Sequence, residues 1–328
     1  MGLNENEIEN NNNSNNNNNN NNNNTNNIEN TKGNEIILNR QLVAIVTGSS
    51  DGLGKVVSGM LAKTNYFVIL ANRDLNKAKL VLDDILATTA NNKNVISMKL
   101  DLSSFDSIKE FVNQFKQLNI PLDVLINNAG IYTPPFSLTE GFESQFMVNH
   151  LGPFLLTNLL MDKFTENARI INLSSLAHKN SEIFNVEDLS CKSIEKYNAL
   201  KRYSNSKLYA ILFTKELDRI LKKNNSKIIA LSLHPGVIST TNLFKHLPGY
   251  AKFVLNLAQP FTTTVNTASI AIYRLAIGSD PELPNLFGGE YFNINVLTDP
   301  IPQALSQENW RLLWAKSCEY CKIEDIGK

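Results

Sequence analysis

Short apolar runs rich in β-branched residues alternate with longer amphipathic segments along most of this chain, and this alternation restricts the fold most strongly. The runs lie at 42–46, 66–71, 95–100, 124–126, 169–173 and 228–233, and helical apolar spacing occurs at 75–88, 105–118, 142–158 and 204–223. Such alternation is typical of βαβ units. It predicts an α/β fold with a doubly wound parallel sheet. Ligands of these sheets bind at the carboxyl ends of the strands, so functional motifs should directly follow the strands.

Residues 1–35 have a different composition, dominated by asparagine, with an unbroken run from Asn15 to Asn24. This segment has almost no apolar surface, so burial cannot offset the conformational entropy lost on ordering. We expect a disordered, low-complexity tail without chemistry of its own. The remaining residues, 36–328, are then one folded domain.

Charge and cysteine content exclude several function classes. The chain carries 31 basic and 31 acidic side chains, so its net charge gives no reason to expect nucleic acid as a partner. No run of about 18 uninterrupted apolar residues is present, which argues against a membrane span. Three cysteines are too few for a disulfide framework and indicate a reducing, cytoplasmic compartment. Cys318 and Cys321 form a C-x-x-C without the further ligands of a metal site, so no metal is expected.

A glycine-rich turn follows the first predicted strand and precedes a helix. Gly48, Gly52 and Gly54 have the spacing G-x-x-x-G-x-G, with Ser50 and Leu53 between them. Glycines here allow a tight bend and let the backbone approach a pyrophosphate, whose charge then faces the amino terminus of the helix. The spacing differs from the common G-x-G-x-x-G and from a Walker phosphate-binding loop. It predicts the phosphate site of a nucleotide cofactor.

Two tyrosine–lysine pairs, Tyr203 with Lys207 and Tyr197 with Lys201, have the i, i+4 spacing that places side chains on one face of a helix. A phenol with a pKa near the reference value of about 10 is a poor proton donor or acceptor at neutral pH. A neighbouring ammonium stabilises the phenolate and lowers that pKa, so either pair is a candidate general acid or base. Spacing alone does not decide between them.

Together with further motifs, these features resemble the ordered motif set of the short-chain dehydrogenases/reductases. The set consists of the glycine turn, Asn127-Asn128-Ala129-Gly130, Asn149, Ser174-Ser175, Tyr203-x-x-x-Lys207 and Pro235-Gly236. It covers about residues 40–320, essentially the whole predicted domain. The phrases at 148–152, 172–178, 234–237 and 289–292 are similar to the retinol dehydrogenase-like and WW-domain oxidoreductase-like branch, without its WW domains. The resemblance implies a Rossmann-like fold.

The resemblance also implies an active site of four residues, Asn149, Ser175, Tyr203 and Lys207. It favours Tyr203 as the proton donor, because an amphipathic helix similar to the family's active-site helix follows it, whereas Tyr197 lies in a polar, irregular stretch. Ser175 is implied to close the fifth strand and to hydrogen-bond the substrate carbonyl oxygen. Ser174 is the alternative, since a one-residue slip exchanges strand faces. Asn149 is implied to lie on the helix after the fourth strand and to hold a water that relays protons to the lysine.

A nicotinamide cofactor is implied at the same edge of the sheet. Its implied contacts are the glycine turn, Tyr203 and Lys207, together with Arg73, Asp101, Leu102, Asn128, Ala129, Gly130, Pro235, Gly236 and Thr240. Asp101 is alternatively the N-cap of the helix that begins near Ser104. His234 is expected to be structural rather than a catalytic base, and His178 is a candidate for contacting the substrate.

The end of the second strand predicts which nicotinamide cofactor is preferred. NAD-specific relatives tend to place an acidic residue there, which binds the ribose 2′-hydroxyl. Here the strand continues into Asn72, Arg73 and Asp74. Asn72 is neutral and Arg73 can pair with a 2′-phosphate, which favours NADP(H) over NAD(H). If the turn is shifted by two residues, Asp74 serves the ribose and Arg73 is only a solvated charge.

The expected activity is hydride transfer that interconverts an aldehyde or ketone and an alcohol. Residues 243–261 are expected to cover the substrate, and their apolar side chains fit a lipophilic, retinal-like carbonyl, contact with a membrane surface, or ordinary packing on the sheet. The alternative function is a catalytically silent nucleotide-binding regulatory or scaffold protein, against which the intact set of four active-site residues argues. The sequence leaves open whether the protein forms a homodimer.

Overall fold

One sheet forms the centre of the folded unit, Gln41–Lys328. The computed structural model describes residues 40–89, 94–238, 262–278 and 286–327, so the tail predicted at 1–35 lies outside the described residues. Within these ranges the sheet contains β1 (Leu42–Thr47), β2 (Tyr66–Asn72), β3 (Val95–Lys99), β4 (Leu122–Asn127), β7 (Phe164–Leu173), β8 (Ile229–His234), β9 (Tyr291–Asn293) and β10 (Val296–Leu297). Their spatial order is β10-β9-β8-β7-β4-β1-β2-β3.

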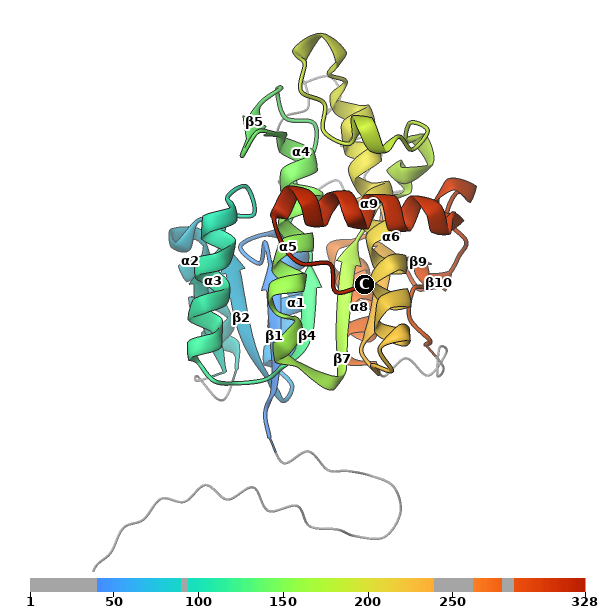
Figure 1. Ribbon diagram of the computed structural model, residues 1–328. Helices are drawn as coiled ribbons and strands as arrows, with labels where there is room; N and C mark the ends of the chain where they lie inside the picture. Colours follow the sequence, from blue (N-terminus) through green and yellow to red (C-terminus); the bar gives the residue numbers. More distant parts are fainter. Residues whose placement is uncertain (1–39, 90–93, 239–261, 279–285, 328) are drawn as a thin grey trace, which may run out of the picture. The chain divides into compact units, whose positions relative to one another are not determined.

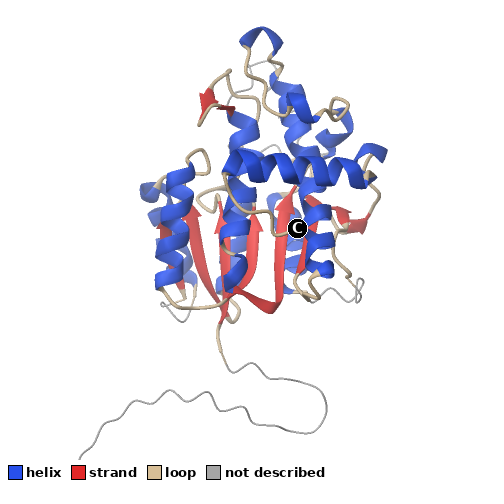
Figure 2. Ribbon diagram, viewed as in Figure 1, coloured by secondary structure: helices blue, strands red, loops and turns tan. Residues whose placement is uncertain are grey.

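Neighbouring strands from β3 to β9 pair in parallel, and β10 is antiparallel to β9. Helices cover both faces of this sheet (Figure 1, Figure 2). The strands β1, β4 and β8 are buried over almost their whole length, because helices lie on both of their faces. Strands in that environment need continuous apolar runs. The predicted doubly wound, Rossmann-like α/β fold is confirmed.

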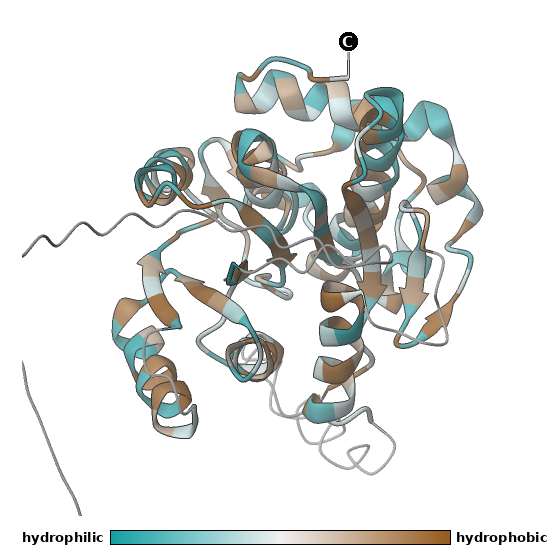
Figure 3. Cartoon of the chain, turned by 90° about the horizontal axis from the view of Figure 1, so that it is seen from below, coloured by the Kyte–Doolittle hydropathy of each residue, from teal (hydrophilic) through white to brown (hydrophobic). Residues whose placement is uncertain are grey.

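Two layers of helices enclose two hydrophobic cores. One layer contains α1 (Gly52–Ala62), α2 (Leu75–Thr88) and α8 (Val265–Ile277), and the other contains α3 (Phe105–Gln117), α5 (Gly152–Leu159) and α6 (Ala199–Lys223). Successive residues of β1 alternate between the cores: Val43 and Ile45 face one, Ala44 and Val46 the other. Viewed from below, the strands are mainly hydrophobic and the surrounding helices carry both kinds of residue (Figure 3).

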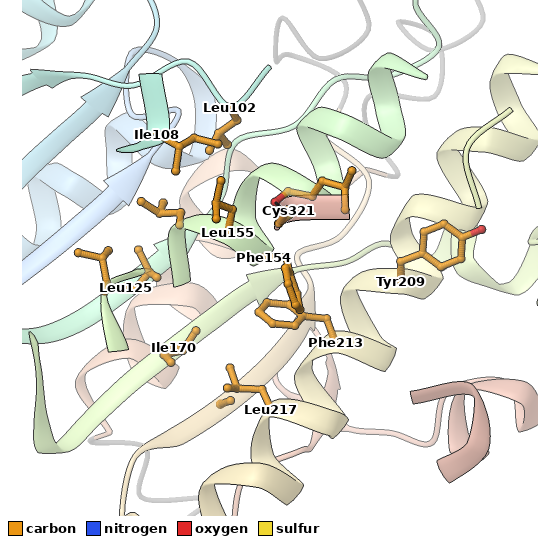
Figure 4. Packing of buried hydrophobic residues seen from close by; sticks show 14 of the residues in the cluster. Leu102, Ile108, Leu125, Phe154, Leu155, Ile170, Tyr209, Phe213, Leu217 and Cys321 are labelled. Carbon is orange, nitrogen blue, oxygen red and sulfur yellow. Dashed lines mark hydrogen bonds between the residues drawn. The ribbon is translucent and has the colours of Figure 1, made fainter. Parts of the chain in front are cut away.

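The helix α9 (Gln307–Cys321) packs across α5 and α6 and extends the second core (Figure 1). Its Trp314 ring lies edge-on to Phe154, with centroids 4.9 Å apart, and stacks on Phe213 at 5.9 Å. Cys318 and Cys321, the C-x-x-C pair, are both buried on this helix, and Cys321 lies in the cluster of Figure 4. The sequence pattern did not predict α8 or α9.

The region predicted as one helix at 142–158 is divided in the structure, so that prediction is wrong in part. Phe142–Glu143 is a short strand, β6, paired with β5 (Leu138–Thr139), and α4 (Ser144–Phe146) follows it. The Glu143 carboxylate accepts hydrogen bonds from the backbone N–H groups of Gln145 and Phe146, so the helix can begin only after Glu143. A π-helical turn, Met147–Leu151, then separates α4 from α5.

Strand β7 also begins earlier than predicted, at Phe164 instead of Arg169. Its first four residues are exposed or half-buried, and a register shift opposite Leu122 and Val124 interrupts its pairing with β4. Polar residues in this exposed part carry no apolar signal. The sequence pattern therefore found only the buried half of the strand.

Candidate active site

The predicted motifs meet at the carboxyl edge of the sheet. The chain runs outward from β1 to β2 and β3, then returns to place β4 on the other side of β1. A motif residue directly follows each of the strands β1, β4, β7 and β8, namely Gly48, Asn128, Ser174 and Pro235. Ligands of doubly wound sheets bind at such a switch point. The topology therefore brings the cofactor motifs and the active-site motifs to one place.

The glycine turn packs tightly against the loop after β4. Gly48 has a left-handed φ of +64°, and a Cβ on it would lie 2.9 Å from the Ala129 Cα. A Cβ on Gly54 would lie 2.5 Å from the Gly48 carbonyl oxygen and 2.6 Å from Asn128 Nδ2. The Thr47 hydroxyl oxygen accepts hydrogen bonds from the backbone N–H groups of Asn128 and Ala129, both at 3.0 Å. Side chains at these glycines would push the two loops apart.

The start of α1 is suited to an anion. Gly52 opens this helix, Ser50 and Leu53 are half-buried beside it, and the Asp51 side chain makes no capping hydrogen bond. By contrast, a side chain caps the start of α2, α3, α6, α8 and α9, namely Asp74, Ser104, Asn198, Thr264 and Ser306. An uncapped helix start exposes N–H donors and the positive end of the helix dipole. Together with the tight bend that the glycines allow, this geometry fits a pyrophosphate.

The last residue of β2, Asn72, and the two residues that follow it have different roles. The Asn72 side chain is buried, and its Nδ2 donates a hydrogen bond of 2.8 Å to the Ser49 hydroxyl. The Asp74 carboxylate accepts from the backbone N–H groups of Asn76 and Lys77 at 3.0 and 3.2 Å, so it caps α2. Arg73 is exposed between them.

The alternative role of Asp101 as a helix N-cap is wrong. Its carboxylate accepts from the backbone N–H and the hydroxyl of Ser103, at 2.9 and 2.6 Å. Ser104 itself caps α3, accepting from the Ser107 N–H at 3.3 Å. Leu102 is buried, and its backbone packs closely against the start of α5. A Cβ on Gly152, the first residue of α5, would lie only 2.6 Å from the Leu102 carbonyl oxygen.

Tyr203 and Lys207 lie one turn apart in α6 and are both buried, with 6% and 7% of their surface exposed. The Lys207 Nζ donates a hydrogen bond of 2.9 Å to the Leu173 carbonyl oxygen and lies 5.5 Å from the centroid of the Tyr203 ring. A Cβ on Gly130 would lie 3.6 Å from the same Nζ. The tyrosine–lysine pair therefore adjoins the loop on which the glycine turn rests.

The structure separates the two candidate serines. The Ser174 hydroxyl donates a hydrogen bond of 2.7 Å to the Lys207 carbonyl oxygen and thereby ties β7 to α6. Ser175 lies two residues beyond the end of β7, rather than closing the strand as predicted, and its side chain interacts with Tyr203 and lowers the pKa of the phenol. Ser175 is therefore the serine that shares a site with the tyrosine.

Asn149 lies in the π-helical turn rather than in a regular helix. Its Oδ1 accepts from the Ile131 N–H at 2.8 Å, and its Nδ2 donates to the Ile131 carbonyl oxygen at 2.9 Å and to the Ser206 hydroxyl at 3.0 Å. These bonds join the loop after β4 to α6. A cavity of about 10 Å³ borders Asn149, Asn127 and His150, and a space of this size holds about one water molecule. Single π-helical turns are frequent at functional sites.

Burial, rather than the lysine charge, dominates the acidity of the tyrosine. Removal from water raises the pKa of Tyr203, the Ser175 side chain lowers it, and Tyr132 raises it further. Burial also lowers the pKa of Lys207 to about 8. The expected lowering of the Tyr203 pKa is therefore wrong for the chain by itself, because desolvation of the phenolate outweighs a cation that is bound to Leu173. At neutral pH Tyr203 stays protonated and Lys207 stays largely charged.

Sequence reasoning missed Tyr132, whose ring lies edge-on to Tyr203 with centroids 4.6 Å apart. Its position in the loop directly after Gly130 was the only available signal.

His234 is buried, as expected for a structural residue. Gly236 has a φ of +100° and leaves no room for a Cβ beside Thr263. Thr240 and the predicted substrate cover at 243–261 lie outside the described residues.

Comparison with known proteins agrees with this geometry. The profile of the short chain dehydrogenase family matches residues 42–249. The chain is 41% identical to human retinol dehydrogenase 13, over 85% of this chain and 84% of that protein. It is 37% identical to human polyprenol dehydrogenase, over 87% and 86% of the two chains, and 36% identical to human WW domain-containing oxidoreductase, over 88% and 70%. The chain belongs to the short-chain dehydrogenase/reductase family, and the predicted likeness to its retinol dehydrogenase-like branch is confirmed.

Proposed function

We propose that this oxidoreductase uses NADP(H) to interconvert a lipophilic aldehyde or ketone and the corresponding alcohol. The observation that carries the proposal is that Ser175 interacts with the buried Tyr203, with the buried ammonium of Lys207 beside it, at the edge of the sheet where the glycine turn lies. A protonated phenol and a hydroxyl that converge in this way can hold one carbonyl oxygen between them.

The chain's own residues supply orientation and the proton. A bound nicotinamide cofactor supplies the hydride that the carbonyl carbon receives. Ser175 and Tyr203 donate hydrogen bonds to the carbonyl oxygen, and Tyr203 releases its proton as negative charge develops there. Lys207 stabilises the resulting phenolate through its charge. Asn149 fixes the loop after β4 against α6 and borders a cavity in which a water would relay a proton toward the lysine.

The cofactor would lie along the edge from the glycine turn to Lys207. The uncapped start of α1 would hold the pyrophosphate, and the residues after the later strands would hold the remainder, namely Asp101, Leu102, Asn128, Ala129, Gly130, Pro235, Gly236 and Thr240. The turn that would approach the pyrophosphate is held by the close packing of Gly48 and Gly54 against the loop after β4, and a Cβ on either glycine would disrupt it. A Gly54→Ala substitution should weaken cofactor binding while a Gly59→Ala substitution on the same helix, where the nearest atom lies 3.9 Å from the added Cβ, should not.

The preference for NADP(H) rests on the residues after β2. Arg73 is exposed, whereas the Asp74 carboxylate already caps α2. An exposed guanidinium at this place can form charge-assisted hydrogen bonds with a 2′-phosphate. We expect Arg73→Ala to raise the KM for NADPH about tenfold, the effect of roughly 1.4 kcal/mol, and to leave the KM for NADH unchanged. Equal effects on both cofactors would contradict the assignment.

The substrate class is supported by the relatives, whose names specify retinol and polyprenol. Both are isoprenoid alcohols, so an isoprenoid aldehyde is the first substrate to test.

We also propose that the protein is cytoplasmic and touches membrane surfaces peripherally, where such substrates partition. None of the helices in the described ranges is long and apolar enough to cross a membrane. A homodimer is compatible with this proposal.

The decisive test is NADPH oxidation with a panel of aliphatic, aromatic and isoprenoid aldehydes, run in parallel with NADH. We expect turnover with NADPH and the highest kcat/KM with an isoprenoid aldehyde. Tyr203→Phe is the control for enzyme-dependent turnover. Tight NADPH binding without turnover on the whole panel would instead favour a catalytically silent nucleotide-binding protein.

A further inference from the structure

His178 is fully buried in the short helical turn that follows β7, Leu176–Asn180. Its ring Nδ1 lies 2.7 Å from the carbonyl oxygen of Ser175, and its backbone N–H donates to the same oxygen at 3.1 Å. A carbonyl oxygen can only accept hydrogen bonds, so the proton of the ring must be on Nδ1. One residue therefore holds the Ser175 carbonyl oxygen from two directions.

The surroundings of the ring favour the neutral form of His178. Burial lowers its pKa, and the charge of Lys179 lowers it further, although the bond to the Ser175 carbonyl acts in the opposite direction. The ring lies edge-on to Tyr291, with centroids 5.0 Å apart. The ring Nε2 of His178 and the hydroxyl of Tyr291 are both buried and have no hydrogen-bond partner among the described residues. A second proton on Nε2 would thus be a buried charge without an acceptor.

The position of Ser175 depends on these bonds. Its hydroxyl oxygen accepts from the Ala177 N–H at 3.2 Å and its side chain interacts with Tyr203, while its carbonyl oxygen is held by His178. Ser175 also lies outside β7, so no strand pairing fixes its backbone. The bonds within the turn are therefore what orients its hydroxyl toward Tyr203.

We propose that His178 is a positioning residue: its Nδ1–H fixes the Ser175 carbonyl and thereby aims the Ser175 hydroxyl at the substrate oxygen held by Tyr203. The inference rests on the proposed function, in which Ser175 binds that oxygen. It replaces the sequence-based expectation that His178 contacts the substrate, since the side chain is fully buried. A misplacement of about 1 Å in a catalytic site can reduce the rate about a hundredfold.

Two matched substitutions test the role of Nδ1. His178→Asn carries an amide N–H at about the reach of Nδ1, whereas His178→Gln carries the same amide one methylene farther out. We expect the Asn variant to retain most of the wild-type kcat, and the Gln variant to lose roughly tenfold to a hundredfold in kcat with its NADPH affinity unchanged. Tyr291→Phe removes the neighbouring buried hydroxyl without touching the bond to Ser175, and should keep the wild-type kcat.

Three outcomes would overturn the role: wild-type kcat in the Gln variant, equal loss in the Asn and Gln variants, or loss of NADPH affinity parallel to loss of kcat. Nitrogen-15 NMR of the histidine-labelled protein gives a readout that does not require turnover. We expect the His178 ring to be neutral with its proton on Nδ1, in wild type and equally in Ser175→Ala, since the acceptor is a backbone oxygen. A proton on Nε2 would refute the inference even if the enzyme is active, whereas lack of turnover with the Nδ1 tautomer present would refute only the proposed function.

Discussion

Two tyrosine–lysine pairs with identical spacing have different structural roles in this protein. Tyr203 and Lys207 both belong to α6 and are buried together. Tyr197 lies before α6, in extended backbone after the short turn Ile194–Lys196, while Lys201 is exposed on the helix. Asn198 caps the start of α6 and so places the boundary between Tyr197 and its lysine. The i, i+4 relation brings side chains together only when both residues are in the same helix.

The hydroxyl of Tyr197 is used for structure. It donates a hydrogen bond of 2.7 Å to the Pro134 carbonyl oxygen and accepts one of 3.3 Å from Gln145 Nε2. Burial, followed by the charge of Glu143, raises the pKa of Tyr197 to about 12, and burial also raises the pKa of Tyr203. A raised pKa therefore does not identify the catalytic tyrosine. The neighbouring serine and lysine do.

The largest expected difference between the pairs is in turnover. Tyr203→Phe removes the proposed proton donor, and loss of general acid catalysis should lower kcat by about 10²–10⁴-fold. Tyr197→Phe should leave kcat unchanged, because its hydroxyl points to the backbone of Pro134. Steady-state kinetics and NADPH titration of both variants would measure this. Equal loss of turnover and cofactor binding in Tyr203→Phe would indicate a folding role instead.

The two lysines should differ by a smaller factor. Lys207→Met removes the buried cation beside the phenol, and loss of one preorganised electrostatic group should lower kcat about a hundredfold. Lys201→Met removes an exposed ammonium that bonds the Asn180 carbonyl oxygen, and should not change kcat. If both variants lost activity to the same extent, the claim that only the Tyr203–Lys207 pair is catalytic would be contradicted.

The pH dependence of carbonyl reduction should report on Lys207. Because burial lowers its pKa to about 8, the ammonium is present below that pH and is lost above it. Tyr203 remains protonated over the same range, since burial raises its pKa. We therefore expect kcat/KM for reduction to fall above about pH 8, by up to tenfold per pH unit. This fall should be absent from the residual activity of Lys207→Met.

The smallest expected effect is on the free energy of unfolding, where Tyr197 should matter more than Tyr203. Tyr197→Phe deletes a partly buried hydrogen bond and should lower the free energy of unfolding by about 1 kcal/mol. Tyr203→Phe should be neutral or slightly stabilising, because it removes the need to bury a phenol hydroxyl. Urea denaturation monitored by circular dichroism would compare the two. A larger destabilisation in Tyr203→Phe would show that its hydroxyl also supports the fold.

Much of the fold could be predicted because the strands with helices on both faces must be apolar throughout. The exposed half of β7 and the helices α8 and α9 were missed; in β7, the polar residues of its first half carry no apolar run. The division of 142–158 was also missed, since the side chain of Glu143 caps a helix that periodicity alone would begin earlier. Single π-helical turns have no distinct periodicity in sequence.

The sequence by itself determined the α/β architecture, the glycine turn and the family, because burial on both strand faces and close backbone packing restrict residue type locally. Only the tertiary structure decided which tyrosine meets a serine, that Ser174 ties β7 to α6 while Ser175 faces Tyr203, and that burial raises the tyrosine's pKa. These properties depend on contacts between segments far apart in the chain and on the removal of water from between them, and neither is recorded in the spacing of residues.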